Sequence, residues 1–276
     1  MCRWVAFSGS PILLEDLIYK PKHSLVDQSL HSQLGVETTN GDGFGVGWYS
    51  DKGRPGVFHS VGPAWSNRNL RELAGQIQAS VFFAHIRAST GTPVQESNCH
   101  PFRYENWLWM HNGSIAQFSK IKRDLMFMVA PDLFSSIQGS TDSELMFYLA
   151  LTFGLRDDPS GAVARMAGFI ESTAQAHDIP DPLQMTVATS DGTSVWSFRY
   201  SSAHNSRSLF YSTAVDTLRH LYPDNPLLQS VSEESRLIVS EPFGDLEGAW
   251  NAVPESMWGV IREGPDKMAM FRPIRP

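Results

Sequence analysis

Hydrophobic and polar positions alternate along several short stretches of the chain, which is the pattern of strands that bury one face. The clearest stretch is 43–49, Gly-Phe-Gly-Val-Gly-Trp-Tyr, in which Phe44, Val46 and Trp48 share one face and three glycines form the other. A face without side chains allows another backbone or a ligand to approach closely. Alternation or a short apolar run predicts further strands at 3–8, 81–88, 107–111, 184–189, 194–200, 208–212, 237–240 and 257–262.

Apolar residues recur at helical spacing in the middle of the chain. At 69–79 they follow the i, i+3, i+4, i+7 stripe of a helix with one buried face. Further helices are expected at 13–19, 115–129, 145–151 and 162–176. The segment Thr141-Asp142-Ser143-Glu144 has the sequence of a capping box and marks the start of the helix expected at 145–151. Strands come first, then helices, then strands again. This order favours an α+β layered domain with mostly antiparallel sheets over a doubly wound parallel fold.

Composition narrows the class of protein. The 276 residues are 42% hydrophobic, 11% aromatic and only 18% charged, which excludes a disordered chain. Twenty-two basic and 29 acidic residues give a net charge of −7, which argues against a nucleic-acid partner held by bulk charge. No run of 18 apolar residues and no signal-peptide pattern is found, so no membrane association is expected. Two cysteines, Cys2 and Cys99, cannot form a disulfide scaffold, which favours a cytoplasmic location.

Cys2 is the first candidate for chemistry. Most free cysteines are small buried hydrophobic residues, and that interpretation stays open here. If Met1 is removed, however, Cys2 carries both a thiol and a free α-amine. An α-amine has a pKa of about 7.7–8.0, so it can act as a general base near neutral pH. One residue would then supply both the nucleophile and its base.

His85 and Arg87 lie two residues apart on one face of the strand expected at 81–88. Arginine within an apolar strand is costly unless it is paired. Its planar fork suits a carboxylate held by two hydrogen bonds, which belongs either to a substrate or to an internal aspartate. The polar loop that follows, 89–93, is suited to ligand contacts.

His111-Asn112-Gly113 stands where the strand at 107–111 is expected to give way to a helix. The amide of Asn112 and the N–H of Gly113 would then point into one small volume, as a developing oxyanion requires. A plain Asn-Gly turn is the commoner use of this dipeptide, and taken alone the local sequence favours it. Asp142, at the start of the capped helix, either stabilises the helix N-terminus or meets a cationic amine.

Other constellations are weaker. Cys99 and His100, together with His85 and His111, match no zinc-binding spacing, so no metal site is predicted. Cys99 also lacks the local signature of a papain-like nucleophile. The glycine-rich segment at 43–47 does not open a helix, as a dinucleotide-binding loop would.

Taken together, these segments resemble, in order, the motifs of the class II glutamine amidotransferases, which belong to the N-terminal-nucleophile hydrolases. Ala88 differs, because many members have tryptophan after the motif arginine. The segments that carry the resemblance are Met1-Cys2, 41–48 (Gly-Asp-Gly-Phe-Gly-Val-Gly-Trp), 84–91 (Ala-His-Ile-Arg-Ala-Ser-Thr-Gly), 98–102 (Asn-Cys-His-Pro-Phe), 109–115 (Trp-Met-His-Asn-Gly-Ser-Ile), 141–144 (Thr-Asp-Ser-Glu), 240–242 (Ser-Glu-Pro) and 250–254 (Trp-Asn-Ala-Val-Pro).

The resemblance implies a four-layer αββα sandwich and a single domain over 2–276, with Met1 removed. It implies that the thiol of Cys2 attacks the γ-amide carbonyl of glutamine or of a γ-glutamyl amide, and that Asn112 and Gly113 stabilise the oxyanion. A γ-glutamyl thioester then forms and is hydrolysed to glutamate.

The resemblance also assigns the substrate contacts. Arg87 would hold the α-carboxylate of the substrate and Asp142 its α-ammonium group. No metal or organic cofactor is implied, and the expected partner is a small γ-glutamyl substrate.

Three functions stay open at this point. The chain is similar to the small stand-alone members of the family, which include the γ-glutamyl amidohydrolases of ergothioneine synthesis and of glutathione breakdown. A second possibility is the ammonia-supplying subunit of a two-protein amidotransferase with a separate synthase. A third is a non-catalytic γ-glutamyl-binding module, against which the intact set of candidate site residues argues.

Overall fold

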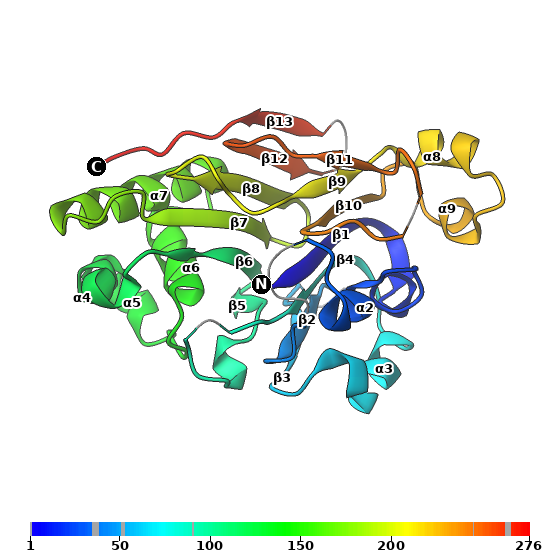
Figure 1. Cartoon of the computed structure of the whole chain (residues 1–276), viewed down its shortest axis with the longest axis horizontal. Coiled ribbons are helices and arrows are strands. Elements are labelled where there is room, and N and C mark those ends of the chain that lie inside the picture. Colours follow the sequence, from blue (N-terminus) through cyan, green and yellow to red (C-terminus); the bar gives the residue numbers. More distant parts are fainter. Residues whose placement is uncertain (1, 35–38, 51–52, 90, 245, 263–265) are drawn as a thin grey trace.

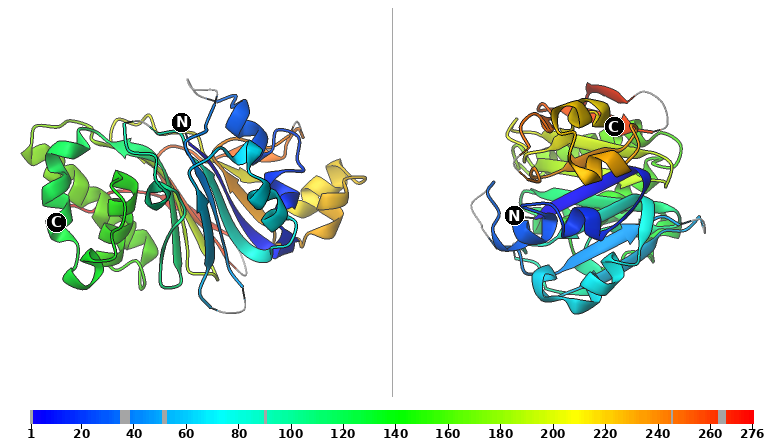
Figure 2. Two further views of the ribbon diagram at one scale, coloured as in Figure 1. Left: turned by 90° about the horizontal axis from the view of Figure 1, so that it is seen from below. Right: turned by 90° about the vertical axis from the view of Figure 1, so that its right-hand side faces the viewer.

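Two antiparallel sheets face each other between two layers of helices in the computed structural model (Figure 1). The structure describes residues 2–34, 39–50, 53–89, 91–244, 246–262 and 266–276. Figure 2 shows the layers edge-on, with the green helices on one side of the paired sheets and the blue and yellow helices on the other. The prediction of an α+β, four-layer αββα sandwich is confirmed.

The first sheet has seven strands over the described residues, in the order β11-β9-β10-β1-β4-β2-β3. Strand β1 lies at its centre, and Val5 pairs with Val239 of β10 on one side and with Ala84 of β4 on the other. Cys2 directly precedes this central strand, so its position is fixed by both neighbours. The strands are β1 (Arg3–Leu13), β2 (Phe44–Trp48), β3 (Gly56–Ser60), β4 (Gln78–Ile86), β9 (Phe210–Ser212), β10 (Arg236–Val239) and β11 (Trp250–Ala252).

The second sheet has six strands in the described part of the chain, in the order β13-β12-β8-β7-β6-β5. The strands are β5 (Phe102–Tyr104), β6 (Trp107–Ile115), β7 (Leu183–Ser190), β8 (Val195–Ser201), β12 (Met257–Ile261) and β13 (Lys267–Met270). Asn112 and Gly113 of β6 pair with Thr186 and Met185 of β7.

The helices divide between the two outer faces. Three short ones, α1 (Glu15–Ile18), α2 (Leu25–Leu30) and α3 (Arg68–Ala74), pack with the apolar outer face of the first sheet. On the second sheet lie α4 (Phe118–Met128), α5 (Pro131–Phe134), α6 (Asp142–Thr152) and α7 (Pro159–Ala176). The remaining elements are α8 (Val215–Leu221), α9 (Pro226–Ser230) and the 3-10 turns η1 (Ala64–Ser66) and η2 (Glu96–Asn98). No helix of the described chain is long and apolar enough to cross a membrane.

A separate apolar layer joins the two sheets. Trp4 and Phe83 of the first sheet meet Leu108 and Met110 of the second, and all four are buried. Because side chains alternate along a strand, the even positions of β6 point between the sheets and the odd positions point toward the helices. This alternation aims Asn112 at the inter-sheet space and His111 at α6.

Several local predictions differ from the structure. Strand β1, expected at 3–8, continues to Leu13 and shortens the helix expected at 13–19. Strand β6 does not end at residue 111, because its pairing with β7 continues to Ile115. The helix expected at 69–79 ends at Ala74, since the residues from Gln78 onward pair with β1. The capping box is half formed: Thr141 accepts from the N–H of Glu144, but that glutamate turns to the preceding loop.

Candidate active site

Cys2 directly precedes β1 and is partly buried. Trp4 and Ala6 point between the sheets, and strand alternation gives Cys2 the same direction. Its Sγ lies 3.5 Å from the backbone N of Ala88 and 3.6 Å from the carbonyl oxygen of that residue. Burial raises the pKa of the Cys2 thiol, and the backbone of Ala88 and neighbouring charges offset only part of that rise. The thiol is therefore protonated at neutral pH and needs a base when it attacks.

Arg87 is buried directly beside this contact, and neutral groups hold its guanidinium. The guanidinium donates to the carbonyl of Asp42 at 3.3 Å and to the hydroxyls of Ser89 and Thr92 at 3.2 and 2.6 Å. The carboxylate of Asp42 accepts from the N–H of Ser89 at 2.8 Å instead. Among the described residues no carboxylate forms an ion pair with Arg87. The internal Arg–Asp pair considered from the sequence is therefore absent from this part of the chain.

Asn112 comes from the opposite sheet and reaches Cys2 directly. Its Nδ2 donates to the carbonyl of Cys2 at 3.0 Å. Gly113 next to it has φ +153°, and a Cβ there would lie 1.9 Å from the carbonyl oxygen of Gln184. Only glycine fits this close approach of β7, so Asn112-Gly113 is part of a strand and not a turn. The turn interpretation of this dipeptide is wrong.

Asp142 begins α6 and closes on the far end of β6. Its Oδ2 accepts from the N–H of Ile115 at 2.9 Å, and its Oδ1 accepts from the N–H of Ser143 at 2.7 Å. The hydroxyl of Ser143 also lies 2.8 Å from Nδ1 of His111. Burial lowers the pKa of His111 despite the nearby Asp142 carboxylate, so the ring is neutral at pH 7.

A buried ion pair fixes the start of the chain on the other side of Cys2. Nε of Arg3 donates to Oε2 of Glu241 at 2.7 Å, and a second nitrogen of Arg3 donates to the carbonyl of Cys2 at 3.0 Å. Ser32 also contacts Arg3 and donates to Oε2 of Glu241 at 3.1 Å. We call Arg3, Ser32 and Glu241 the N-terminal anchor.

Both carboxylate oxygens of Glu241 have hydrogen-bond partners. The backbone N–H groups of Gln33 and Leu34 donate to it at 2.9 and 3.0 Å, and Nε2 of His23 lies 2.5 Å from Oε1. Burial alone raises the pKa of Glu241, but these hydrogen bonds and the Arg3 guanidinium outweigh it, so the net pKa is lowered. The carboxylate is therefore ionised and satisfied by the protein.

Two further histidines fill the space near the site without joining its chemistry. The rings of His85 and His100 stack with centroids 4.2 Å apart, and neither ring has a hydrogen-bond partner among the described residues. Burial lowers the pKa of His85 to about 3 and that of His100 well below its ordinary value. Both rings are neutral and serve as packing groups. Within the described ranges no group of three or more His, Cys, Asp or Glu side chains is placed to hold a metal ion.

The bare face of β2 is covered by the chain itself. A Cβ on Gly45 would lie 2.2 Å from the carbonyl oxygen of His100, and one on Gly43 would lie 2.7 Å from Sγ of Cys99. The prediction that another backbone approaches this face is confirmed. Cys99 is fully buried there, and burial raises its pKa to about 11, which is unfavourable for a nucleophile.

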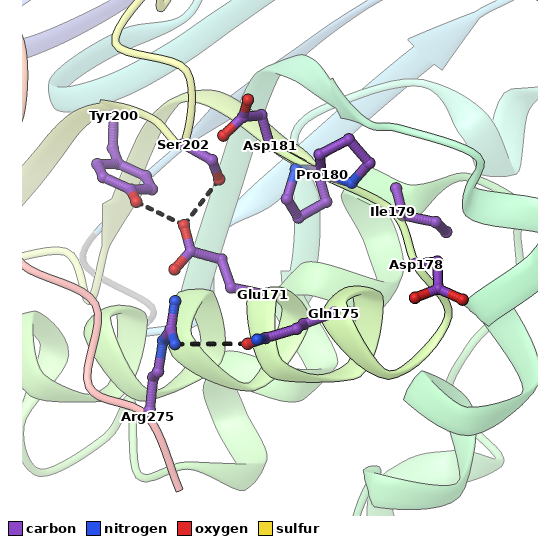
Figure 3. A pocket seen from close by; sticks show the side chains of 10 residues that line it. Glu171, Gln175, Asp178, Ile179, Pro180, Asp181, Tyr200, Ser202 and Arg275 are labelled. Carbon is purple, nitrogen blue, oxygen red and sulfur yellow. Dashed lines mark hydrogen bonds between the residues drawn. The ribbon is translucent and has the colours of Figure 1, made fainter.

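A larger cavity of about 630 Å³ lies elsewhere, between α7 and the ends of β7 and β8 (Figure 3). Its central carboxylate is Glu171, whose Oε1 accepts from the hydroxyls of Tyr200 and Ser202 at 2.5 and 2.7 Å. None of the residues predicted for the site lines this cavity. Size alone therefore does not locate the chemistry.

The structure brings Ala88 and Asn112 each into direct contact with Cys2, and Arg87 is adjacent to Ala88 in the chain. Asp142 joins the group through β6, by its bond to Ile115. Met1 and Thr90, which belong to the quoted motifs, lie outside the described residues.

Sequence reasoning missed the partnership of Arg3 with Glu241. The two are 238 positions apart, and the only local signal was the Ser-Glu-Pro segment at 240–242.

Comparison with known proteins agrees with this geometry. The family model of class II glutamine amidotransferases matches residues 22–273. The chain belongs to the class II glutamine amidotransferases. It is an enzyme of the N-terminal-nucleophile fold, and the family resemblance of the sequence motifs is confirmed.

Relatives of known sequence align with most of this chain. The chain is 35% identical to the probable glutamine amidotransferase DUG3 of Saccharomyces cerevisiae, over 95% of this chain and 82% of that protein. It is 27% identical to the γ-glutamyl-hercynylcysteine sulfoxide hydrolase of Mycolicibacterium smegmatis, over 95% and 96% of the two chains.

Solved structures show the same architecture. A glutamine amidotransferase class II domain protein from Silicibacter pomeroyi superposes with a TM-score of 0.75 at 30% identity, over 99% of this chain and all of that one. The glutamine phosphoribosylpyrophosphate amidotransferase of Bacillus subtilis gives a TM-score of 0.62 at 14% identity, over 98% of this chain and 49% of that one. The second likeness concerns the fold alone.

Proposed function

We propose that this enzyme hydrolyses the γ-amide bond of glutamine or of a γ-glutamyl amide through a thioester on Cys2 and releases glutamate. The observation that carries the proposal is the 3.0 Å hydrogen bond from Asn112 to the carbonyl of Cys2. It places an amide donor from the second sheet directly against the residue that carries the proposed nucleophilic thiol. An oxyanion donor and a nucleophile must share such a volume for acyl transfer.

The proton transfers start from the α-amine of Cys2, which removal of Met1 exposes. This amine accepts the thiol proton while the sulfur bonds to the γ-carbonyl carbon. The oxyanion that forms receives hydrogen bonds from Nδ2 of Asn112 and from the N–H of Gly113. When the intermediate collapses, the C–N bond breaks and the α-ammonium group gives its proton to the leaving amine. Water then adds to the thioester with the amine again as base, and glutamate and the free thiol are released.

Arg87 and Asp142 would bind the glutamyl head. Arg87 is a buried cation whose described partners are all neutral, so a substrate carboxylate would supply the missing negative charge. Asp142 accepts hydrogen bonds from two backbone N–H groups and from the hydroxyl of Ser143. A carboxylate has about four acceptor positions, so one position is left for an ammonium group. A substrate that lacks the carboxylate would leave the buried Arg87 without a counter-charge, and one that lacks the ammonium group would leave the partly buried Asp142 without one.

The proposal is tested by intact mass together with a glutamate-release assay on glutamine and on γ-glutamyl amides. We expect active protein to begin at Cys2. A glutamine-like electrophile should modify Cys2 and not Cys99. A fully active preparation that retains Met1 on every chain would rule out the N-terminal base, and inactivation that tracks modification of Cys99 would move the nucleophile there.

The same chemistry would serve an ammonia-supplying subunit with a separate synthase. Co-purification from the native cell separates this case from a stand-alone hydrolase. A cytoplasmic location, the independence from nucleic acid and the single domain over 2–276 stay predictions of the sequence.

A further inference from the structure

A second, smaller cavity of about 210 Å³ opens beside the proposed oxyanion donor. Asn112 forms part of its wall, together with Arg3 and residues 205–208 of the loop between β8 and β9. Neither Arg87 nor Asp142 lines it. The cavity therefore lies outside the part of the site that would bind the charged head of a γ-glutamyl substrate.

The lining of this cavity is cationic. Arg3 and Arg207 both border it, and no carboxylate does. The charge of Arg3 is already matched, because Glu241 pairs with it at 2.7 Å. Arg207 differs: its Nε is buried without a hydrogen-bond partner, and it forms no ion pair with any residue that the structure describes.

The loop that carries Arg207 is held by other contacts. The carboxylate of Glu255 accepts from the N–H and hydroxyl of Ser206 at 3.1 and 2.5 Å, and Nε of Arg199 donates to that hydroxyl at 2.9 Å. Arg199 also lies 4.0 Å from Glu255. The neighbouring arginine and serine thus contact Oε2 of Glu255, and Oε1 of that carboxylate is buried without a hydrogen-bond partner among the described residues. Arg207 forms no ion pair with it and borders the cavity.

A buried donor without an acceptor is unfavourable, and a guanidinium is best satisfied by a carboxylate that takes two of its N–H groups. The scissile carbonyl of the substrate would lie at Asn112, with the glutamyl head on the side of Arg87. The amine side of the amide would then be directed to the remaining space at Asn112, which includes this cavity. Its volume is below the roughly 300–1,000 Å³ of whole-ligand pockets, so it suits a terminal group.

We propose that this cavity receives the amine side of the scissile amide and that Arg207 pairs there with a carboxylate of the substrate. The inference rests on the γ-glutamyl amide hydrolysis proposed above and names its substrate class. The enzyme prefers γ-glutamyl derivatives of amino acids or peptides to glutamine and to amides of uncharged amines. Arg207 is then a specificity-determining residue.

The test uses two substrates that differ only in the proposed contact, γ-glutamylglycine and γ-glutamylglycinamide. Glutamate release gives kcat/KM for each, with glutamine as a third substrate. For the wild-type enzyme we expect kcat/KM to be about 10- to 100-fold higher for the glycine substrate, because charge-assisted hydrogen bonds are among the stronger ones.

Two variants assign that preference to a residue. Arg207→Gln should lower kcat/KM for γ-glutamylglycine to about the value for the glycinamide, which itself changes less than about threefold. Arg207→Lys keeps the charge but loses the fork, so it should retain part of the preference. Arg123→Gln, which removes the same charge from the exposed face of α4, is the matched control and should leave both values unchanged.

The outcomes separate the two proposals. If the wild-type enzyme releases glutamate from none of the three substrates, the proposed function fails and this inference fails with it. If it hydrolyses both glycine derivatives equally well, the function stands and the inference is wrong. Equal losses on both substrates in Arg207→Gln, with a lowered thermal midpoint, would make Arg207 a residue that stabilises the fold and would overturn its role in specificity. If Arg207→Gln does not fold, the ratio of the two kcat/KM values still tests the inference, in the wild-type enzyme and in Arg207→Lys.

Discussion

The two sides of Cys2 satisfy their charges in opposite ways. On one side, the N-terminal anchor pairs Arg3 with Glu241 and fills the remaining positions of that carboxylate with backbone and side-chain donors. On the other side, Arg87 is equally buried but bonds only to a carbonyl and to hydroxyls among the described residues. The comparison separates a charge that stabilises the fold from a charge that is available to a ligand.

This difference has an energetic basis. Breaking a buried ion pair by removing one partner leaves the other charge uncompensated, at a cost of about 3–5 kcal/mol. A buried cation held by neutral groups is already tolerated by the fold, so changing it mainly affects what it binds. Variants of the proposed substrate contacts, Arg87 and Asp142, should therefore lose activity and keep their thermal midpoint. Variants in the N-terminal anchor should lower the thermal midpoint.

Replacement of the proposed nucleophile should have the largest effect on activity. Cys2→Ala should reduce glutamate release to background, because no thioester forms, while the thermal midpoint stays near that of the wild type. Cys99→Ala is the matched control: it removes a fully buried thiol, so it should lower the midpoint but retain activity. Residual turnover in pure Cys2→Ala protein would exclude the covalent mechanism.

Asn112→Asp tests the oxyanion donor. Aspartate replaces the donor that reaches Cys2 by an acceptor-only carboxylate and places negative charge where it develops in the transition state. Loss of one such donor typically costs roughly 10²–10³ in kcat, and repulsion should add to this, with a smaller change in KM. Asn251→Asp, at a side chain that binds Thr213, is the control. A folded Asn112→Asp enzyme with near-normal kcat would remove Asn112 from the mechanism.

Arg87→Lys and Arg3→Lys test the comparison directly, since both keep the charge and lose the fork. For Arg87→Lys we expect KM for glutamine to rise about 10- to 100-fold, because an ammonium group makes only one of the two parallel hydrogen bonds to a carboxylate. Its thermal midpoint should change little. Arg3→Lys should instead lower the midpoint, since Arg3 contacts Glu241, Ser32 and Cys2. Equal behaviour of the two variants would abolish the distinction between anchor and substrate side.

Glu241→Gln should destabilise the protein by about 3–5 kcal/mol, because Arg3 loses its counter-charge. Urea unfolding at pH 7 measures this change. Glu105→Gln removes the carboxylate of an exposed pair with Arg156 and should cost about 1 kcal/mol or less. A loss for Glu241→Gln no larger than that of the control would show that the anchor is not a structural pair.

The smallest expected effect is the pH dependence of the anchor. The pKa of Glu241 is lower in the folded state than the value of about 4.3 for an unfolded glutamate. Its stabilisation is therefore fully present above about pH 4.3 and is lost as pH falls through the folded-state pKa. The unfolding free energy should drop between these two values in the wild type and less steeply in Glu241→Gln. Glu144, whose pKa burial raises, contributes with the opposite sign in both proteins and cancels in the difference.

The sequence predicted the alternating strands and the motif order well because both are local signals. The strand that alternation predicts within 43–49 is observed at Phe44–Trp48. The extent of β6 was not predictable locally, since Gly113 adopts its backbone conformation only because Gln184 approaches from β7. Short edge strands such as Trp250–Ala252 were missed because three residues carry no periodicity.

Part of the candidate site could likewise be predicted from the sequence, and part could not. Cys2, Arg87, Asn112 and Asp142 stand in recognisable motifs, so their residue types and order could be identified in advance. The sequence does not show which of the buried arginines already has a carboxylate partner, because that depends on the folded structure. Arg207 has no motif around it, and only the missing partner in the structure sets it apart.

The central position of β1 has a consequence for synthesis of the protein. Its partner on one side, β4, is translated early, but β10 and Glu241 lie more than 230 residues after Cys2. At about 5–20 residues per second, a ribosome needs roughly 10–50 s to reach them. Until then the first residues pair on one side only and lack their ion pair. The proposed removal of Met1 therefore has a defined period on the ribosome, which closes when the last part of the first sheet emerges and secures the new N-terminus.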